Sequence, residues 1–306
     1  MARAGAARIT VVGDALIDEL RDPSGSKEFV GGAALNVAVG LALLGQDVTL
    51  VAMVGDDEPG DRIRAFLADY GVRLVGSPSP HGSSRAVSDR SDGGEPRYVF
   101  NEAAQQRRLD FGAATREALE DADLVVVSCY PFDDDEQVDA LLSAVADPER
   151  RLVVDGNPRA GMMHDRARFL ENFERTAARS LLVKAGDEDA ELLAGETLDA
   201  FVRRLRGDAA HPAVVATAGR AGAAVHAGDL DVHADIVLLP GPVVDTMGAG
   251  DATLAAIVDR IAADGVPGSA EAWSAALERA MTIAAATVRH EGALLRTGEP
   301  PTAFGS

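Results

Sequence analysis

A short glycine-rich segment between two aspartates carries the strongest chemical signal in this sequence. Residues 243–254 read VVDTMGAGDATL, and apolar residues then recur at helical spacing as far as Ile261. A glycine loop that opens into a helix lets an oxyanion approach backbone N–H groups at the positive helix end. Asp251 falls in the first turn, so its carboxylate would face whatever the loop binds. The same residues also fit an ordinary glycine-rich turn in which Asp251 caps the helix, and the loop alone does not decide between the two.

A second candidate site lies near the N-terminus, where residues 31–36 read GGAALN. One interpretation is a tight turn before a helix with a polar start. The other is a polyol site, in which the glycine pair exposes backbone N–H groups and Asn36 offers both a donor and an acceptor. Asp18 precedes this segment and carries two acceptor oxygens, which suit vicinal hydroxyls.

The composition limits the class of protein. A chain of 306 residues with 47% hydrophobic residues can bury a large core, and its formal net charge of −20 argues against a nucleic-acid partner. Cys129 is the sole cysteine, so no internal disulfide is possible. No signal peptide, membrane span or zinc-ligand spacing is apparent. We therefore expect a cytoplasmic α/β protein whose partners are small molecules.

Alternating strands and helices should position these segments. Short apolar β-branched runs alternate with amphipathic segments that often stop at glycine, which is the βαβ pattern of a doubly wound parallel sheet. The expected strands are 9–12, 48–54, 124–128, 152–155, 181–184 and 213–217, followed by antiparallel strands 223–226 and 231–238. The expected helices are 33–44, 58–70, 135–146, 166–179, 187–194, 198–206 and 270–288, besides the helix after the glycine loop.

Polar side chains stand where several of these strands end. Asp155 with Asn157, Lys184 and Thr217 each come at or just after the end of a buried run. Because ligands bind beyond the carboxyl ends of the strands in open α/β sheets, we expect these side chains to converge on one crevice.

Two stretches interrupt the alternation. Residues 17–30 and 84–101, the latter with a turn at 92–94, have the pattern of short antiparallel strands. We interpret them as a small sheet that projects from the core. Its open edges make a homodimer through this sheet one expectation, although a monomer is equally compatible with the sequence.

Taken together, the two glycine segments resemble the signatures of the ribokinase-like carbohydrate kinases of the PfkB family. That family has a Gly-Gly…Asn helix start near the N-terminus and an Asp-Thr-x-Gly-Ala-Gly-Asp loop near the C-terminus. Four further segments follow in family order, at residues 53–60, 155–159, 183–189 and 217–222. The resemblance implies one three-layer α/β/α domain over residues 1–306 with a mainly parallel sheet. It also implies a β-sheet lid made from about 16–31 and 84–102.

The resemblance also implies roles for individual residues. Asp251 matches the general base that takes the proton from a sugar hydroxyl, and Gly248, Ala249 and Gly250 match the anion hole. The matching sugar-binding positions are Asp18, Gly31, Gly32 and Asn36, with Arg159 as a further candidate. The matching nucleotide-binding positions are Lys184, Thr217, Gly219, Gly222 and Met281. Asp189 matches an acidic residue that organises Mg²⁺ through water, and Asp245 matches a ligand of a monovalent cation.

Some positions depart from the family pattern. Gly186 stands where many members have an Asn near the magnesium, and Arg296 replaces a small hydroxylic ligand of the monovalent cation. In the lid, Asn101 stands where an Arg is common among kinases of fructose and keto-deoxygluconate. That replacement weakens the case for a sugar-acid substrate, because the Arg would pair with its carboxylate, although Arg159 could compensate.

These observations predict an ATP-dependent sugar kinase of the fructokinase-like branch that phosphorylates a primary hydroxyl and uses Mg²⁺. A kinase of ribose, a nucleoside or keto-deoxygluconate is the alternative within the same class. A sugar- or nucleotide-sensing protein without catalysis is the alternative from another class, because fold alone does not establish activity.

Overall fold

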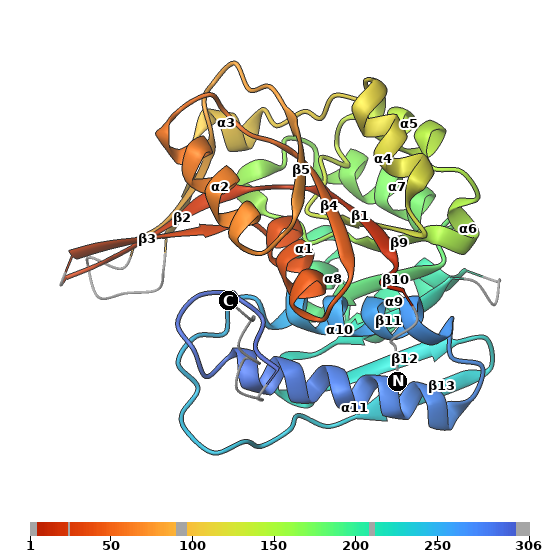
Figure 1. Ribbon diagram of the computed structural model, residues 1–306. Coiled ribbons are helices and arrows are strands. Elements are labelled where there is room, and N and C mark those ends of the chain that lie inside the picture. Colours follow the sequence, from red (N-terminus) through yellow and green to blue (C-terminus); the bar gives the residue numbers. More distant parts are fainter. Residues whose placement is uncertain (1–4, 24, 90–96, 208–211, 298–306) are drawn as a thin grey trace.

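Buried runs of β-branched residues form the central strands of the molecule (Figure 1). The computed structural model describes residues 5–23, 25–89, 97–207 and 212–297. Nine strands form one sheet in the order β13-β12-β11-β10-β9-β8-β1-β4-β5. The strands are β1 (Arg8–Gly13), β4 (Asp47–Met53), β5 (Arg73–Ser77), β8 (Leu124–Ser128), β9 (Leu152–Asp155), β10 (Leu182–Gly186), β11 (Ala213–Thr217), β12 (Ala223–Ala227) and β13 (Leu230–Ala234). Pairing is parallel from β11 to β5, whereas β12 and β13 add antiparallel to the edge of β11.

Helices cover both faces of this sheet, which makes three layers. One face carries α1 (Ala33–Leu43), α2 (Glu58–Asp69), α10 (Ala249–Asp264) and α11 (Ala270–Thr287). The other carries α4 (Ala113–Asp121), α5 (Asp135–Ala144), α7 (Arg166–Ala177), α8 (Asp187–Ala194) and α9 (Leu198–Arg206). Side chains of β8 alternate between the two apolar cores, with Val126 in one and Val127 in the other. In the described part of the chain, no helix has the length and apolar character needed to cross a bilayer.

A separate sheet of four strands projects from the core beside α2, as Figure 1 shows. Its order is β3-β2-β6-β7, with β2 (Leu16–Asp22), β3 (Gly25–Gly31), β6 (Ser84–Asp89) and β7 (Arg97–Phe100). The prediction that these strands are all antiparallel is wrong for the central pair, because β2 and β6 run parallel. The segment between them holds β3, α1, β4, α2 and β5. Because no tight hairpin turn joins β2 to β6, the two strands can run in the same direction. The predicted turn at residues 92–94 lies outside the described residues.

Most predicted elements of the core are present with small shifts at their ends. The strand predicted over 231–238 is shorter and ends at Ala234, because Ala234 pairs with Ala223, the first residue of β12. Strand β5 and helix α4 were not predicted. The short helices α3 (Glu102–Gln105), α6 (Pro148–Arg151), η1 (Ala160–Met162) and η2 (Gly219–Ala221) were not predicted either.

The order of the strands reverses between β1 and β8. From β1 the sheet grows through β4 to β5 in one direction, and from β8 it grows through β9, β10 and β11 in the other. In open α/β sheets the loops at the carboxyl ends of the strands part at such a point, and ligands usually bind there. We therefore expect ligand-binding residues at the carboxyl ends of β1, β8, β9 and β10.

Candidate active site

The glycine loop folds tightly against a second loop before α10 begins. Gly248 has a φ of 75°, in the left-handed region, and a methyl group added to it would meet the Ala293 carbonyl oxygen at 2.3 Å. Any side chain here would be both strained and obstructed. Gly248 is the N-cap residue of α10, without a side-chain cap bond, so Asp251 lies inside the first turn and is not the cap.

The Asp251 carboxylate is buried and held by two side-chain amides. It is 8% exposed. Asn36 Nδ2 donates to Oδ2 at 2.9 Å, and Asn157 Nδ2 donates to Oδ1 at 3.3 Å. Burial raises the pKa of Asp251 to about 6, and the hydrogen bond from Asn36 opposes that rise. A carboxylate with a pKa near neutrality is suited to accept a proton in a reaction.

Asp18 reaches the same region from the lid strand β2. Its carboxyl occupies space that Gly31 leaves open, because a methyl group added to Gly31 would come within 2.1 Å of Asp18 Oδ2. Burial and the neighbouring Asp14 raise the pKa of Asp18 to about 7. The pairing of Asp18 with Gly31 therefore brings two predicted sugar-binding residues into direct contact.

Asp14 supports this corner from the end of β1. Its Oδ1 accepts a hydrogen bond from the Ala34 backbone N–H at 2.9 Å, beside the N-cap Gly32 of α1. Burial raises the pKa of Asp14, whereas the Ala34 N–H, Arg107 and Arg159 oppose the rise. Arg159 is solvent-exposed, yet its positive charge also lowers the pKa of Asp251. Arg159 therefore lies on the solvent side of the acidic cluster formed by Asp14, Asp18 and Asp251.

A buried ion pair lies beneath the glycine loop. Lys184 Nζ is 2.8 Å from Asp155 Oδ2, and the two side chains are 6% and 0% exposed. Burial disfavours the ammonium, but Asp155 and Asp189 together raise the pKa of Lys184 above its usual value. A methyl group added to Gly250 would come within 3.4 Å of Lys184 Nζ. The ammonium therefore lies directly against the loop that would hold an anion.

Asp189 lies in the first turn of α8, just after β10, and Thr217 ends the neighbouring strand β11. Asp189 Oδ2 accepts a hydrogen bond from the Gly186 backbone N–H at 2.8 Å, and burial raises the pKa of Asp189. A methyl group added to Gly186 would be 3.3 Å from Asp189 Oδ2 and 3.4 Å from Thr217 Oγ1. Gly186 therefore lets these two side chains approach each other.

Three predicted nucleotide-binding positions lie further from Asp251 along the sheet. Gly219 is exposed on η2, whereas Gly222 is buried at the start of β12, against the Ala234 carbonyl. Met281 on α11 is 7% exposed and belongs to the large apolar core.

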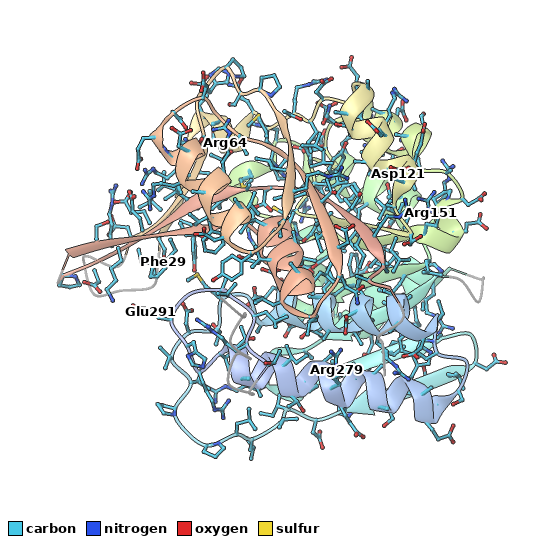
Figure 2. The ribbon with its side chains drawn as sticks, in the orientation of Figure 1. Phe29, Arg64, Asp121, Arg151, Arg279 and Glu291 are labelled. Carbon is cyan, nitrogen blue, oxygen red and sulfur yellow. The ribbon has the colours of Figure 1, made fainter. Side chains whose placement is uncertain are left out.

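Asp245 joins the glycine loop to the loop that follows α11. Its Oδ1 accepts from the Met247 backbone N–H at 3.0 Å and its Oδ2 from the Gly292 backbone N–H at 3.2 Å. The second loop also reaches the lid, because Lys27 Nζ of β3 lies 2.5 Å from Glu291 Oε1. Figure 2 shows Phe29 of β3 and Glu291 at this junction.

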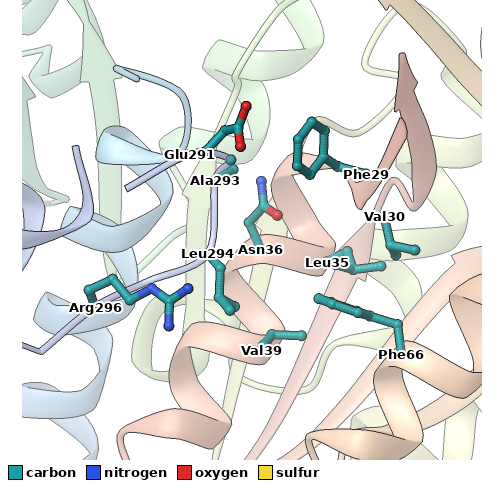
Figure 3. A pocket seen from close by; sticks show the side chains of 11 residues that line it. Phe29, Val30, Leu35, Asn36, Val39, Phe66, Glu291, Ala293, Leu294 and Arg296 are labelled. Atoms are coloured by element: carbon teal, nitrogen blue, oxygen red, sulfur yellow. The ribbon is translucent and has the colours of Figure 1, made fainter. Parts of the chain in front are cut away.

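A largely apolar cavity of about 200 Å³ lies where the lid, α1, α2 and this loop meet (Figure 3). Its lining residues are Phe29, Val30, Leu35, Asn36, Val39, Phe66, Arg296 and residues 291–294. Asn36 thus borders the cavity and bonds to Asp251. The cavity separates the base of the lid from the loop behind Gly248.

Three residues of this site have no individual role that the sequence predicts. Asp14, Asp155 and Asn157 are all buried and touch helix α1, Lys184 and Asp251 respectively. Each follows or ends a buried strand run, so their positions were visible as polar strand ends. Their partners were not visible, because the contacts join residues that are far apart in the sequence.

Comparisons with known proteins agree with this architecture. The model of the pfkB family carbohydrate kinases matches residues 4–297. A fructokinase of Klebsiella pneumoniae is 28% identical over 297 residues, which cover 94% of this chain and 95% of that protein. A fructokinase of Rhizobium leguminosarum bv. trifolii is 30% identical over 278 residues, covering 84% and 80%. A crystal structure of Vibrio cholerae O395 fructokinase with fructose, ADP and potassium has a TM-score of 0.79 at 20% identity, covering 95% and 96%. The predicted fold class is confirmed.

The raised pKa of Asp18 predicts a substitution that stabilises the protein at high pH. The folded state favours the neutral carboxyl, so wild type loses stability as the pH rises from the ordinary value of 3.8 to about 7. Asp18→Asn has no charge to bury. We expect its free energy of unfolding in urea, relative to wild type, to increase between pH 4 and pH 8.

Glu19 on the same strand is the matched control, because its pKa is shifted in the opposite direction. Its hydrogen bond with Arg21 lowers the pKa of Glu19 from 4.5 to about 2. Glu19→Gln should therefore destabilise the protein above pH 4.5, and the loss should shrink as the pH falls towards 2. An Asp18→Asn effect that is the same at pH 4 and pH 8 would contradict the buried-carboxyl interpretation.

Proposed function

Because the chain belongs to the pfkB family of carbohydrate kinases, we propose that it is a fructokinase-like enzyme. It transfers the γ-phosphoryl group of ATP to a primary hydroxyl of a small sugar. Fructokinases match nearly its whole length, which supports fructose as the first candidate acceptor.

The observation that carries the proposal is the buried Asp251 at the start of α10. Its carboxylate lies beside the anion-binding loop and is oriented by Asn36 and Asn157. A sugar hydroxyl between the lid and α10 would give its proton to Asp251 as it attacks the γ-phosphorus. Phosphoryl transfer depends mostly on such positioning and on electrostatic stabilisation.

The loop Gly248-Ala249-Gly250 would supply the electrostatic stabilisation that phosphoryl transfer needs. The first N–H groups of a helix have no intrahelical partners and carry the positive end of the helix dipole. Aimed at the transferring phosphoryl group, they would stabilise its negative charge. Lys184, close to Gly250, adds a positive charge that is already held by Asp155.

The acceptor side is formed by residues of β2, β3 and α1. Asp18 would accept hydrogen bonds from vicinal hydroxyls, Asn36 would bind a further hydroxyl, and Gly31 and Gly32 would let backbone groups approach the sugar. Arg159 would close this region from the solvent side. The lid strands would exclude water when they close over the sugar.

The nucleotide would lie along the ends of β10 and β11. Thr217, Gly219 and Gly222 would line the phosphate and ribose region, with Lys184 near the phosphates. Met281 would pack near the adenine. Thr217 lies beside Asp189 in front of Gly186, so it would stand near the metal.

The acidic residues fit Mg²⁺ bound largely through water. Among the described residues there is no cluster of three or more protein ligands for a metal. Mg²⁺ that bridges ATP phosphates needs only one or two carboxylates. Asp189 and the buried Asp155, whose Oδ1 has no hydrogen-bond partner among the described residues, would hold it. The ion would neutralise phosphate charge. A monovalent cation at Asp245 would share its carboxylate with the Met247 and Gly292 N–H groups.

A test of the catalytic base is Asp251→Asn. The amide cannot accept the proton, so we expect kcat to fall by about 10² or more, while ATP still binds in calorimetry. Asp259→Asn on the same helix is the matched control, since Asp259 is also 8% exposed but pairs with Arg279. Near-normal kcat in Asp251→Asn would contradict this assignment.

The acceptor is identified by coupled ADP release with fructose, ribose, adenosine and keto-deoxygluconate. We expect the highest kcat/KM with fructose, because fructokinases match nearly the whole length of the chain. We expect a low value with keto-deoxygluconate, because Asn101 caps α3 at the position where an arginine would pair with the carboxylate of a sugar acid. A higher kcat/KM with another of these compounds would assign the enzyme to the branch of the family that phosphorylates that compound. If the protein releases no ADP with any of these acceptors, we infer a sugar- or nucleotide-sensing protein in place of a kinase.

We also propose that the enzyme works in the cytoplasm as a homodimer through its lid. The outer strands β3 and β7 have open edges, and Tyr98 and Val99 on β7 are 55% and 47% exposed. Tyr98→Lys combined with Val99→Lys should give a monomer in sedimentation equilibrium, whereas wild type should be a dimer. A wild-type monomer at the concentrations used for kinetics would overturn this arrangement.

A further inference from the structure

Asn157 is a buried amide that reaches the proposed base from a distant part of the chain. It lies two residues beyond the end of β9 and is 7% exposed. Its Nδ2 donates to Asp251 Oδ1 across a sequence separation of 94 residues. The segment therefore links the end of the central sheet directly to the first turn of α10.

The backbone of Asn157 is held in an uncommon conformation. Its φ is 39°, in the left-handed region that residues other than glycine rarely adopt. The preceding Gly156 is pressed against the Phe173 ring, since a methyl group added there would meet a ring carbon at 3.1 Å. Strain that the surrounding packing enforces is characteristic of functional positions. Here the conformation turns the Asn157 amide towards Asp251.

Asn157 and Asn36 bind different oxygens of the same carboxylate. Asn36 comes from α1 and donates to Oδ2, whereas Asn157 comes from the loop after β9 and donates to Oδ1. Each carboxylate oxygen has a second lone pair, so an acceptor hydroxyl can still bind. Two donors on opposite oxygens fix the rotation of the carboxylate as well as favouring its ionised form.

We propose that Asn157 is a positioning residue for phosphoryl transfer, which orients the Asp251 carboxylate towards the acceptor hydroxyl and keeps it ionised. The inference rests on the proposed function, in which Asp251 is the base. It assigns Asn157 a task distinct from that of Asn36, which would also bind the sugar.

Four charged residues also act on Asp251. Asp155 of β9 raises the pKa of Asp251, whereas Lys184 of β10 and Arg159 of the loop after β9 lower it. Asp18 of β2 interacts with it through mutual repulsion. Asn157→Gly leaves all four charges in place and adds none, so a change in the titration of Asp251 in that variant reports the loss of the amide.

Asn157→Gly removes the amide and keeps a residue that tolerates the left-handed backbone. In protein labelled with ¹³C-aspartate and without sugar, we expect the pKa of Asp251 to be up to about one unit higher than in wild type. The carboxyl signal is assigned by its loss in Asp251→Asn. In turnover, we expect kcat to fall about tenfold or more, with the KM for ATP within about twofold.

Asp147→Gly is the matched control, because Asp147 is an exposed left-handed residue with a φ of 46° that lies before β9. It should change neither the titration nor kcat. Asn157→Asp provides a second variant if Asn157→Gly melts at a much lower temperature. It keeps the size of the side chain, and its added negative charge should raise the pKa of Asp251 further.

An unchanged Asp251 titration and a kcat within twofold of wild type in a folded Asn157 variant would overturn the proposal. A shifted titration with unchanged kcat would also overturn it, because the contact would then be structural only. If wild type releases no ADP with any sugar, the proposed function fails. In that case the titration still shows whether Asn157 acts on Asp251, so the two failures remain distinguishable.

Discussion

An ionised carboxylate is costly to bury, and the active site of this protein depends on meeting that cost for Asp251. The protein surrounds the group with donors and positive charge: two side-chain amides, the N-terminal end of α10, and the cations Lys184 and Arg159. These partners compensate burial only in part, because the pKa of Asp251 still rises to about 6. The remaining imbalance suits the proposed role of Asp251, since a base must be ionised near neutral pH and still attract a proton.

Much of the surrounding architecture follows from that one requirement. The partners come from α1, from the loop after β9 and from β10, so the sheet must bring strands from both sides of its switch point together. The glycines allow the close approaches: Gly248 fits against Ala293, and Gly31 makes room for Asp18. The ion pair with Asp155 holds the Lys184 ammonium in place under the loop. An unpaired lysine side chain would be mobile there. Asp14 and Asp251 both repel the Asp18 carboxylate, so bringing these acidic residues together opposes the stability of the fold.

The sequence predicted the local features well and the distant contacts poorly. The continuous apolar run of β8 and the helical spacing after the glycine loop are strong local patterns, and β8 has the predicted bounds. Strand β5 has few buried residues and therefore little apolar pattern to detect. The parallel pairing of β2 with β6 and the bond from Asn157 to Asp251 join residues separated by a whole structural unit or more. No local propensity encodes such pairs, so the sequence could mark Asn157 only as a polar strand end.

If Asp251 is the base, its carboxylate must face the reacting hydroxyl of the sugar. A crystal structure of the protein with fructose and a non-hydrolysable ATP analogue would show whether it does. We expect a primary hydroxyl oxygen within about 3 Å of the Asp251 carboxylate, with the γ-phosphate beside Gly248 and Gly250. A sugar whose hydroxyl nearest the γ-phosphate contacts another carboxylate, such as Asp14 or Asp18, would contradict it.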